Sequence, residues 1–152
     1  MRIFILLIIT IAFIGCTPQQ ETIDFQQVLE DAQPRANQGK SLSEDTLLVQ
    51  ALEHYQNMEP RDTTKLHQAT ILAAYHYWWK GDKSKAYDLL DSIAETDKNA
   101  LNALFDLGNR DSNFETCYEC LKRIMNDGSG NNFWYQQAWA TLHFYLNQPE
   151  EC

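Results

Sequence analysis

The strongest constraint on the fold is an apolar stripe that occurs three times with the same helical spacing. The stripes consist of Leu48, Ala51, Leu52 and Tyr55, then Ala86, Leu89, Leu90, Ile93 and Ala94, then Cys117, Cys120, Leu121, Ile124 and Met125. Residues at i, i+3, i+4 and i+7 share one face of an α-helix, so each stripe predicts a helix with one buried face. The stripes follow one another by 38 and 31 residues. Periods of about 20 to 50 residues are typical of repeat architectures.

Three further helices are expected between and after these stripes, at residues 64–80, 99–108 and 133–147. Gly81 can take the left-handed conformation that ends a helix, and Asp82 can cap the next one. The segments 41–44 and 112–115 fit the Ser-x-x-Glu pattern of a capping box, with Ser41 and Ser112 as the caps. No segment has the alternation of a strand, which predicts an all-α fold of helix pairs.

The segment 70–93 resembles a tetratricopeptide repeat, and a more degenerate copy follows it. The matching positions are Thr70, Ala73, Ala74, Tyr77, Gly81, Asp82, Lys83, Ala86 and Leu90, then Leu101, Leu104, Phe105, Gly108, Ser112, Asn113, Phe114, Cys117 and Leu121. Lys83 departs from the usual turn tyrosine, and Trp139 and Leu142 begin a third copy. The resemblance implies a short right-handed α-solenoid of about 2.5 repeats over residues 41–152. Its antiparallel helix pairs would stack to form a concave groove lined by the first helix of each pair.

The resemblance also implies which residues face that groove. They are Gln68, Ile71, Tyr75, Trp78 and Trp79 from the first copy, and Asn99, Asn102, Asp106, Asn109 and Arg110 from the second. Amide side chains can bond the backbone of an extended peptide while an apolar side chain rests on an aromatic ring, so a protein or peptide ligand is expected. A glycan is the alternative, since exposed aromatic rings stack on sugars. Each aromatic could instead belong to the core.

The N-terminus predicts a lipid anchor. An apolar run of about twelve residues follows Arg2, and at about 18 Å as a helix it is too short to span a bilayer of roughly 30 Å, so residues 1–15 are expected to be a signal peptide. Phe13-Ile14-Gly15-Cys16 resembles the bacterial lipoprotein box, which implies acylation of Cys16; the alternative is an ordinary signal peptide with an incidental cysteine. Residues 16–40 are expected to form a tether with one short helix, whose apolar side chains allow it to dock on the domain. The expected location is a bacterial envelope, on the outer membrane facing the periplasm.

The charge of the chain argues against a nucleic-acid partner. The formal charge is −9, and removal of residues 1–15 with Arg2 makes it −10. Such a chain repels phosphate backbones, and no cluster of basic residues offsets this locally.

Cys117 and Cys120 have the two-residue spacing of redox and zinc motifs. Their place in the third stripe favours burial in the core, with a disulfide to Cys152 and a redox or metal role as the alternatives. The histidines form no catalytic motif, so neither an enzyme nor a cofactor or metal is expected.

The sequence thus predicts a membrane-anchored, non-catalytic module that binds a protein or peptide. A glycan-binding lipoprotein and a thiol-redox or metal role through Cys117 and Cys120 remain as alternatives. The last helix, 133–147, lacks a following partner, so it either caps the array or packs against a second chain in a homo-oligomer or a larger envelope complex.

Overall fold

The computed structural model of the chain describes residues 23–126 and 133–147. Within these ranges the chain forms helices and turns and contains no strand, so the prediction of an all-α fold is confirmed. The helices are α1 (Phe25–Asn37), α2 (Leu47–Asn57), α3 (Thr63–Trp79), α4 (Lys83–Asp91), α5 (Lys98–Arg110), α6 (Phe114–Asn126) and α7 (Phe133–Asn147). The expected cleavage site and Cys16 lie outside the described residues, as does Cys152.

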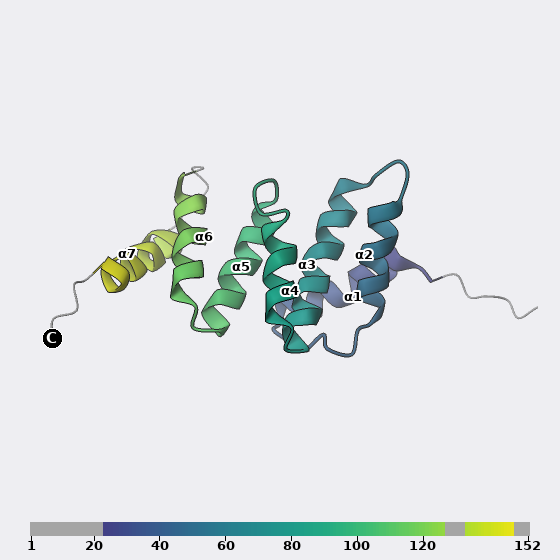
Figure 1. Cartoon of the computed structure of the whole chain (residues 1–152), viewed down its shortest axis with the longest axis horizontal. Helices are drawn as coiled ribbons and strands as arrows, with labels where there is room; N and C mark the ends of the chain where they lie inside the picture. The colour runs from purple at the N-terminus through teal and green to yellow at the C-terminus, as the bar shows by residue number, and fades with distance from the viewer. Residues whose placement is uncertain (1–22, 127–132, 148–152) are drawn as a thin grey trace, which may run out of the picture.

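The helices form a row in chain order, from α2 at one end to α7 at the other, with α1 lying behind α2 and α3 (Figure 1). Each helix packs against the next one in the chain, and α3 also packs against both α1 and α5. The odd-numbered helices α1, α3 and α5 therefore form one layer. The even-numbered helices α2, α4 and α6 lie between them in sequence and cover the opposite side.

The turns within the three helix pairs share one geometry. Gly39, Gly81 and Ser112 have positive φ angles of 67°, 89° and 56°. In each turn the next backbone N–H donates to a carbonyl five residues earlier, as in the 2.9 Å bond from Asp82 to Tyr77 and the 2.8 Å bond from Asn113 to Gly108. This is the Schellman arrangement that ends a helix at a left-handed residue. The role expected for Gly81 is confirmed, and it recurs in each pair.

Helices α1, α3 and α5 also begin alike, because each has an aspartate as its N-cap. Asp24, Asp62 and Asp97 accept backbone N–H groups of the first turn of α1, α3 and α5. Side-chain oxygens of this kind satisfy donors that have no partner within the helix. The pairs α1–α2, α3–α4 and α5–α6 therefore share the same kind of N-cap on their first helix and the same kind of turn between their helices.

The two expected capping boxes are wrong. Ser112 is the left-handed residue that ends α5, and the Asn113 side chain, at 3.2 Å from the Thr116 N–H, caps α6 instead. Ser41 bonds the backbone N–H of Ser43 in a turn, while α2 begins only at Leu47. Both motifs mark chain reversals rather than the helix starts predicted for them.

Helix α1 lies in the segment that was expected to be a tether, and it packs on the array. Leu29, Ala32 and Ala36 bury its apolar face against α2 and α3. The Arg35 guanidinium binds both carboxylate oxygens of Asp45 in the loop that follows, at 2.7 and 3.0 Å. These contacts make α1 and α2 the first helix pair of the row.

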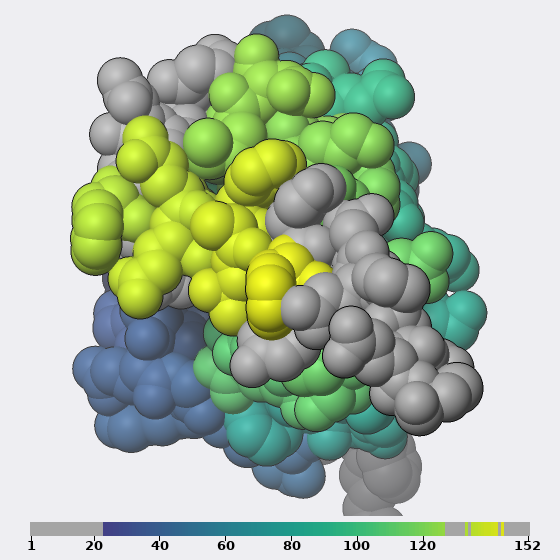
Figure 2. Space-filling model, turned by 90° about the vertical axis from the view of Figure 1, so that its left-hand side faces the viewer, coloured from purple at the N-terminus to yellow at the C-terminus, as the bar shows by residue number. Residues whose placement is uncertain are grey.

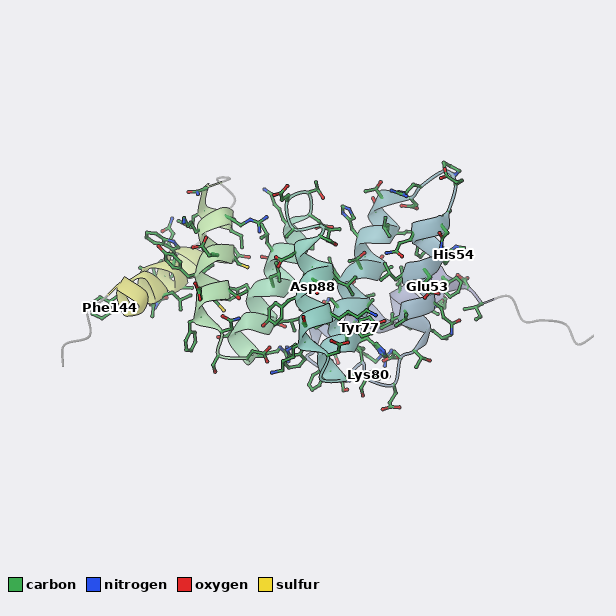
Figure 3. All side chains as sticks on the ribbon, in the orientation of Figure 1. Glu53, His54, Tyr77, Lys80, Asp88 and Phe144 are labelled. Atoms are coloured by element: carbon green, nitrogen blue, oxygen red, sulfur yellow. The ribbon has the colours of Figure 1, made fainter. Side chains whose placement is uncertain are left out.

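Helix α7 lies across the far end of the row against α6 (Figure 2). Phe144 is 58% exposed and lies at the tip of α7, at the opposite end of the molecule from Glu53 and His54 of α2 (Figure 3). Phe133 is 78% exposed. None of the described helices combines the length and the apolarity that crossing a bilayer requires.

Candidate functional site

A groove of about 700 Å³ runs along α3 between α1 and α5. Helix α3 forms its floor, while α1, α5 and the loop between α4 and α5 form its walls. It is lined by Gln33, Asn37, Thr63, Thr64, His67, Gln68, Ile71, Tyr75, Thr96, Asp97, Asn99, Asn102 and Ala103. Most of these side chains are uncharged amides or hydroxyls, although the chain as a whole has a formal charge of −9.

The structure brings together half of the residues that the repeat pattern assigned to a groove. Those that line it are Gln68, Ile71, Tyr75, Asn99 and Asn102; those that do not are Trp78, Trp79, Asp106, Asn109 and Arg110. The division follows position along the helices. The assigned residues nearer the N-terminal ends of α3 and α5 face the groove, and those nearer the C-terminal ends lie outside it.

Trp78 is part of the packing between helices rather than of the groove. Its indole N–H donates to Asp111 Oδ2 at 3.0 Å, and Lys83 and Arg110 each place their charge within 6 Å of its ring, at 5.9 and 5.7 Å. Trp79 lies almost perpendicular to Trp78 and packs against the core formed by α1, α2 and α3. Neither tryptophan lines the groove, because each ring is half-buried in a different contact between helices.

Asp106 and Arg110 lie beyond one end of the groove, where they hold Tyr75. The Tyr75 hydroxyl donates to Asp106 Oδ2 at 3.1 Å, and Arg110 Nε donates to the same oxygen at 2.9 Å. Burial and the neighbouring Asp106 carboxylate raise the pKa of Tyr75 well above its ordinary value. Gly39 adjoins the guanidinium, since a Cβ at this position would lie 3.2 Å from an Arg110 terminal nitrogen. Tyr75 is thus held neutral, with its ring in the groove and its hydroxyl engaged at the end.

Asn109 faces a separate cavity of about 400 Å³ between α5, α6 and α7. Phe105, Phe114 and Leu142 give this cavity an apolar lining. Asn109 therefore lines this cavity, on the α7 side of α5, and not the groove between α1, α3 and α5.

Helix α1 contributes amides to the groove that the sequence analysis did not identify. Gln68 donates to Gln33 Oε1 at 3.3 Å, and Gln33 donates to Asn37 Oδ1 at 3.1 Å, so the three amides form a chain from α3 to α1. On the other wall, Tyr135 of α7 donates to Asn102 Oδ1 at 2.9 Å. Gln33 and Asn37 share a face of α1 in sequence, but only the docking of α1 turns that face into a wall.

His67 and Asp97 form the second feature of the groove that the sequence analysis missed. His67 Nδ1 lies 3.1 Å from Asp97 Oδ2, and the two side chains are only 16% and 15% exposed. They are 30 residues apart in the chain and meet because α3 and α5 pack side by side with their N-terminal ends together. No local motif marks the pair.

Cys117 and Cys120 are free and buried, as the third stripe predicted. Burial raises the pKa of Cys117 and raises that of Cys120 to about 12, which disfavours the thiolate needed for redox chemistry or metal binding. Among the described residues, no group of three or more His, Cys, Asp or Glu side chains could hold a metal ion. The two thiols therefore lie in the core and not in the groove.

No protein family, curated protein or solved structure matches this chain.

Proposed function

We propose that this chain is a short tetratricopeptide-like array that binds an extended peptide segment of another protein. The observation that carries the proposal is the groove itself, whose lining of amides and hydroxyls comes from α1, α3, α5 and the α4–α5 loop. Each amide offers both a donor and an acceptor, which matches the alternating N–H and C=O groups of a peptide backbone. Ile71 and Ala103 provide an apolar floor for side chains. The recurrent caps and left-handed turns support the repeat assignment.

A glycan is the second candidate ligand, and the positions of the aromatic residues weigh against it. Tyr75 is the one Phe, Tyr or Trp side chain in the lining, within the described part of the chain. Trp78 and Trp79, the rings best suited to stack on a sugar, are half-buried in contacts between helices. A groove of amides with one aromatic ring suits a peptide better than a sugar chain.

We further propose that acylated Cys16 holds the protein at a bacterial envelope membrane. The support is the lipoprotein-like sequence before Cys16, together with the start of the helical array at Phe25, within the segment that follows Cys16. Two or three acyl chains, at about 0.8 kcal/mol per buried methylene, would make the attachment effectively permanent. Mass spectrometry of the mature N-terminus should find an acylated Cys16, and Cys16→Ser should release the protein from the membrane.

The groove can be tested with substitutions that leave the contacts between helices intact. Asn99 is exposed and lines the groove, while Asn109 is exposed on the same helix and lies outside it. A photo-crosslinking amino acid is placed at each position in turn, and the protein is irradiated in intact cells. We expect position 99, but not position 109, to capture a partner protein. Captured partners that are identical at both positions would contradict the groove as the binding site.

A further inference from the structure

Helix α7 presents an apolar outer face at the end of the row. Phe133 is 78% exposed and Phe144 is 58% exposed, although phenylalanine is usually buried. Gln137 and Ala140 are exposed as well and lie between them at helical spacing, so the four residues form one stripe along α7, here called the outer stripe. Tyr135, on the opposite side of the helix, packs against the core. The outer stripe therefore faces away from the array.

The outer face of α2, at the other end of the row, has the opposite character. Gln50, Glu53, His54 and Asn57 are exposed there, and Figure 3 shows Glu53 and His54 at the opposite end of the molecule from Phe144. Polar outer faces of this kind cover the ends of helical repeat arrays and keep them soluble. The α2 end of the row is thus covered by polar side chains, whereas the α7 end exposes apolar rings.

The charges of the chain indicate what can cover the outer stripe. Among the seven helices that the structure describes, α7 alone contains no Asp, Glu, Lys or Arg. The chain as a whole has a formal charge of −9, so two copies repel each other wherever acidic surfaces meet. A strongly charged partner would find no opposite charge on α7, and a helix that lies in a membrane interface carries Lys or Arg on its polar face. An uncharged face is what a second copy of the same acidic chain requires.

The outer stripe is also complementary to itself. Phe133 and Gln137 are four residues apart, as are Ala140 and Phe144, so the stripe has the same spacing in both directions. In an antiparallel pair of α7 helices, each Phe133 would lie opposite the Phe144 of the other copy, and each Gln137 opposite an Ala140. Such a contact closes a dimer, whereas α7 packed on the polar α2 end of the next copy would generate an open chain of copies.

We propose that two copies of this chain form a twofold-symmetric dimer through antiparallel α7 helices, with two Phe133–Phe144 pairs in the contact. Aromatic pairs of this kind contribute more than their buried area alone. The groove contains no residue of α7, so the dimer does not rest on the proposed peptide binding, and it would carry two grooves. A contact between two helices of 15 residues is smaller than a standard interface, so a covalent trap is used to detect it.

The first test traps the dimer as a disulfide in intact cells that make the full-length chain. Two copies with different tags are co-expressed in a Cys152→Ser background, one with Phe133→Cys and the other with Phe144→Cys, so the mixed dimer retains one of its two phenylalanine pairs. We expect a disulfide between the two tagged copies. Either variant alone should give about tenfold less, because equivalent positions then lie about 16 Å apart along the helix axis. Gln50→Cys, at an exposed glutamine of α2, is the control for random collision and should give no disulfide.

The second test uses charge to separate the contact from the fold. A photo-crosslinking amino acid at position 140, close to the twofold axis, should capture a second copy when the other residues of the outer stripe are unchanged. Phe133→Glu/Phe144→Glu brings like charges together at both pairs and should reduce the crosslinked dimer about tenfold. Phe133→Lys/Phe144→Glu places a lysine opposite a glutamate at both pairs, and should restore the crosslinked dimer to within about threefold of that with both phenylalanines. This rescue would show that the loss comes from the contact and not from misfolding.

Several results would overturn the inference. Disulfides that form equally well with Phe133→Cys alone would indicate a different pairing of the helices, and equal capture by both charged variants and the unchanged stripe would place the contact elsewhere. Capture of a lipid or of a different protein at position 140 would assign the outer stripe to a membrane or to another partner, and absence of capture would exclude the dimer. None of these results bears on the peptide groove, which is tested separately at position 99.

Discussion

Trp78 Nε1 donates to Asp111 Oδ2 at 3.0 Å, and this bond joins the last turn of α3 to the residue that follows α5. The same carboxylate accepts Lys83 Nζ at 2.6 Å and the Tyr87 hydroxyl at 3.1 Å. The Asp111 side chain is only 10% exposed. It connects α3, α4 and α5 along the edge of the array that carries the left-handed turns.

We expect Asp111→Ala to lower the free energy of unfolding by about 1 to 3 kcal/mol, because the half-buried Trp78 and Tyr87 donors lose their acceptor. Urea denaturation followed by tryptophan fluorescence measures the change. Asp88→Ala is the matched control, since Asp88 is an exposed aspartate of α4 (Figure 3) and its loss should change stability by less than about 0.5 kcal/mol. Equal effects of the two substitutions would argue against a central role for Asp111.

The Asp111 contribution should depend on pH. Burial raises the pKa of the Asp111 carboxyl, but the hydrogen bonds from Lys83, Trp78 and Tyr87 together outweigh it, so the pKa lies below its ordinary value. A carboxyl with a lowered pKa in the folded state stabilises the fold above its unfolded-state pKa of about 3.9, and this stabilisation is lost as the pH falls through the folded-state pKa.

Unfolding free energies of wild-type protein and Asp111→Asn, measured from pH 7 down to pH 3, provide the check. Their difference should be constant above about pH 5 and should shrink below about pH 4, since asparagine does not titrate. A difference that grows on acidification would contradict the assigned sign.

Gly108 allows α6 to approach α5 closely. A Cβ at this position would lie 3.0 Å from Cys117 Sγ and 3.3 Å from the Asn113 carbonyl oxygen. Replacement of a helical glycine by alanine would otherwise stabilise the helix by about 1 kcal/mol. We expect the free energy of unfolding gained from Gly108→Ala to be smaller in the wild-type background than in the Cys117→Ala background, where the sulfur is absent. A double-mutant cycle in urea should give a coupling of about 1 kcal/mol, and additive effects would show that the contact relaxes without cost.

The thiols of Cys117 and Cys120 should be inert in the folded protein. Their side chains are buried, and burial raises the pKa of both, so thiolate is scarce at neutral pH. In a Cys16→Ser/Cys152→Ser background, an aromatic disulfide reagent should release no chromophore at pH 7.5 and two equivalents after denaturation. Rapid reaction of either thiol in the folded state would revive the redox alternative.

The limits of sequence-based prediction are clearest in the groove. Periodicity placed α2 to α7 within a few residues, because an apolar stripe at helical spacing must be buried and Gly81 must end a helix. The groove residues Gln68, Asn99 and Asn102 came instead from the resemblance to a tetratricopeptide repeat. It could not separate Tyr75 from Trp78, since both face the same general side of α3 and only neighbouring helices decide which ring is covered.

Local patterns in the sequence thus determined the helices, their buried faces and the core position of Cys117 and Cys120, because these depend on spacing within about four residues. Tertiary structure alone decided that α1 is part of the array, that Trp78 is bound to Asp111, and that His67 meets Asp97. Each of these contacts joins residues far apart in the chain. Such contacts form only when whole helices pack together, and a short stretch of sequence cannot predict that packing.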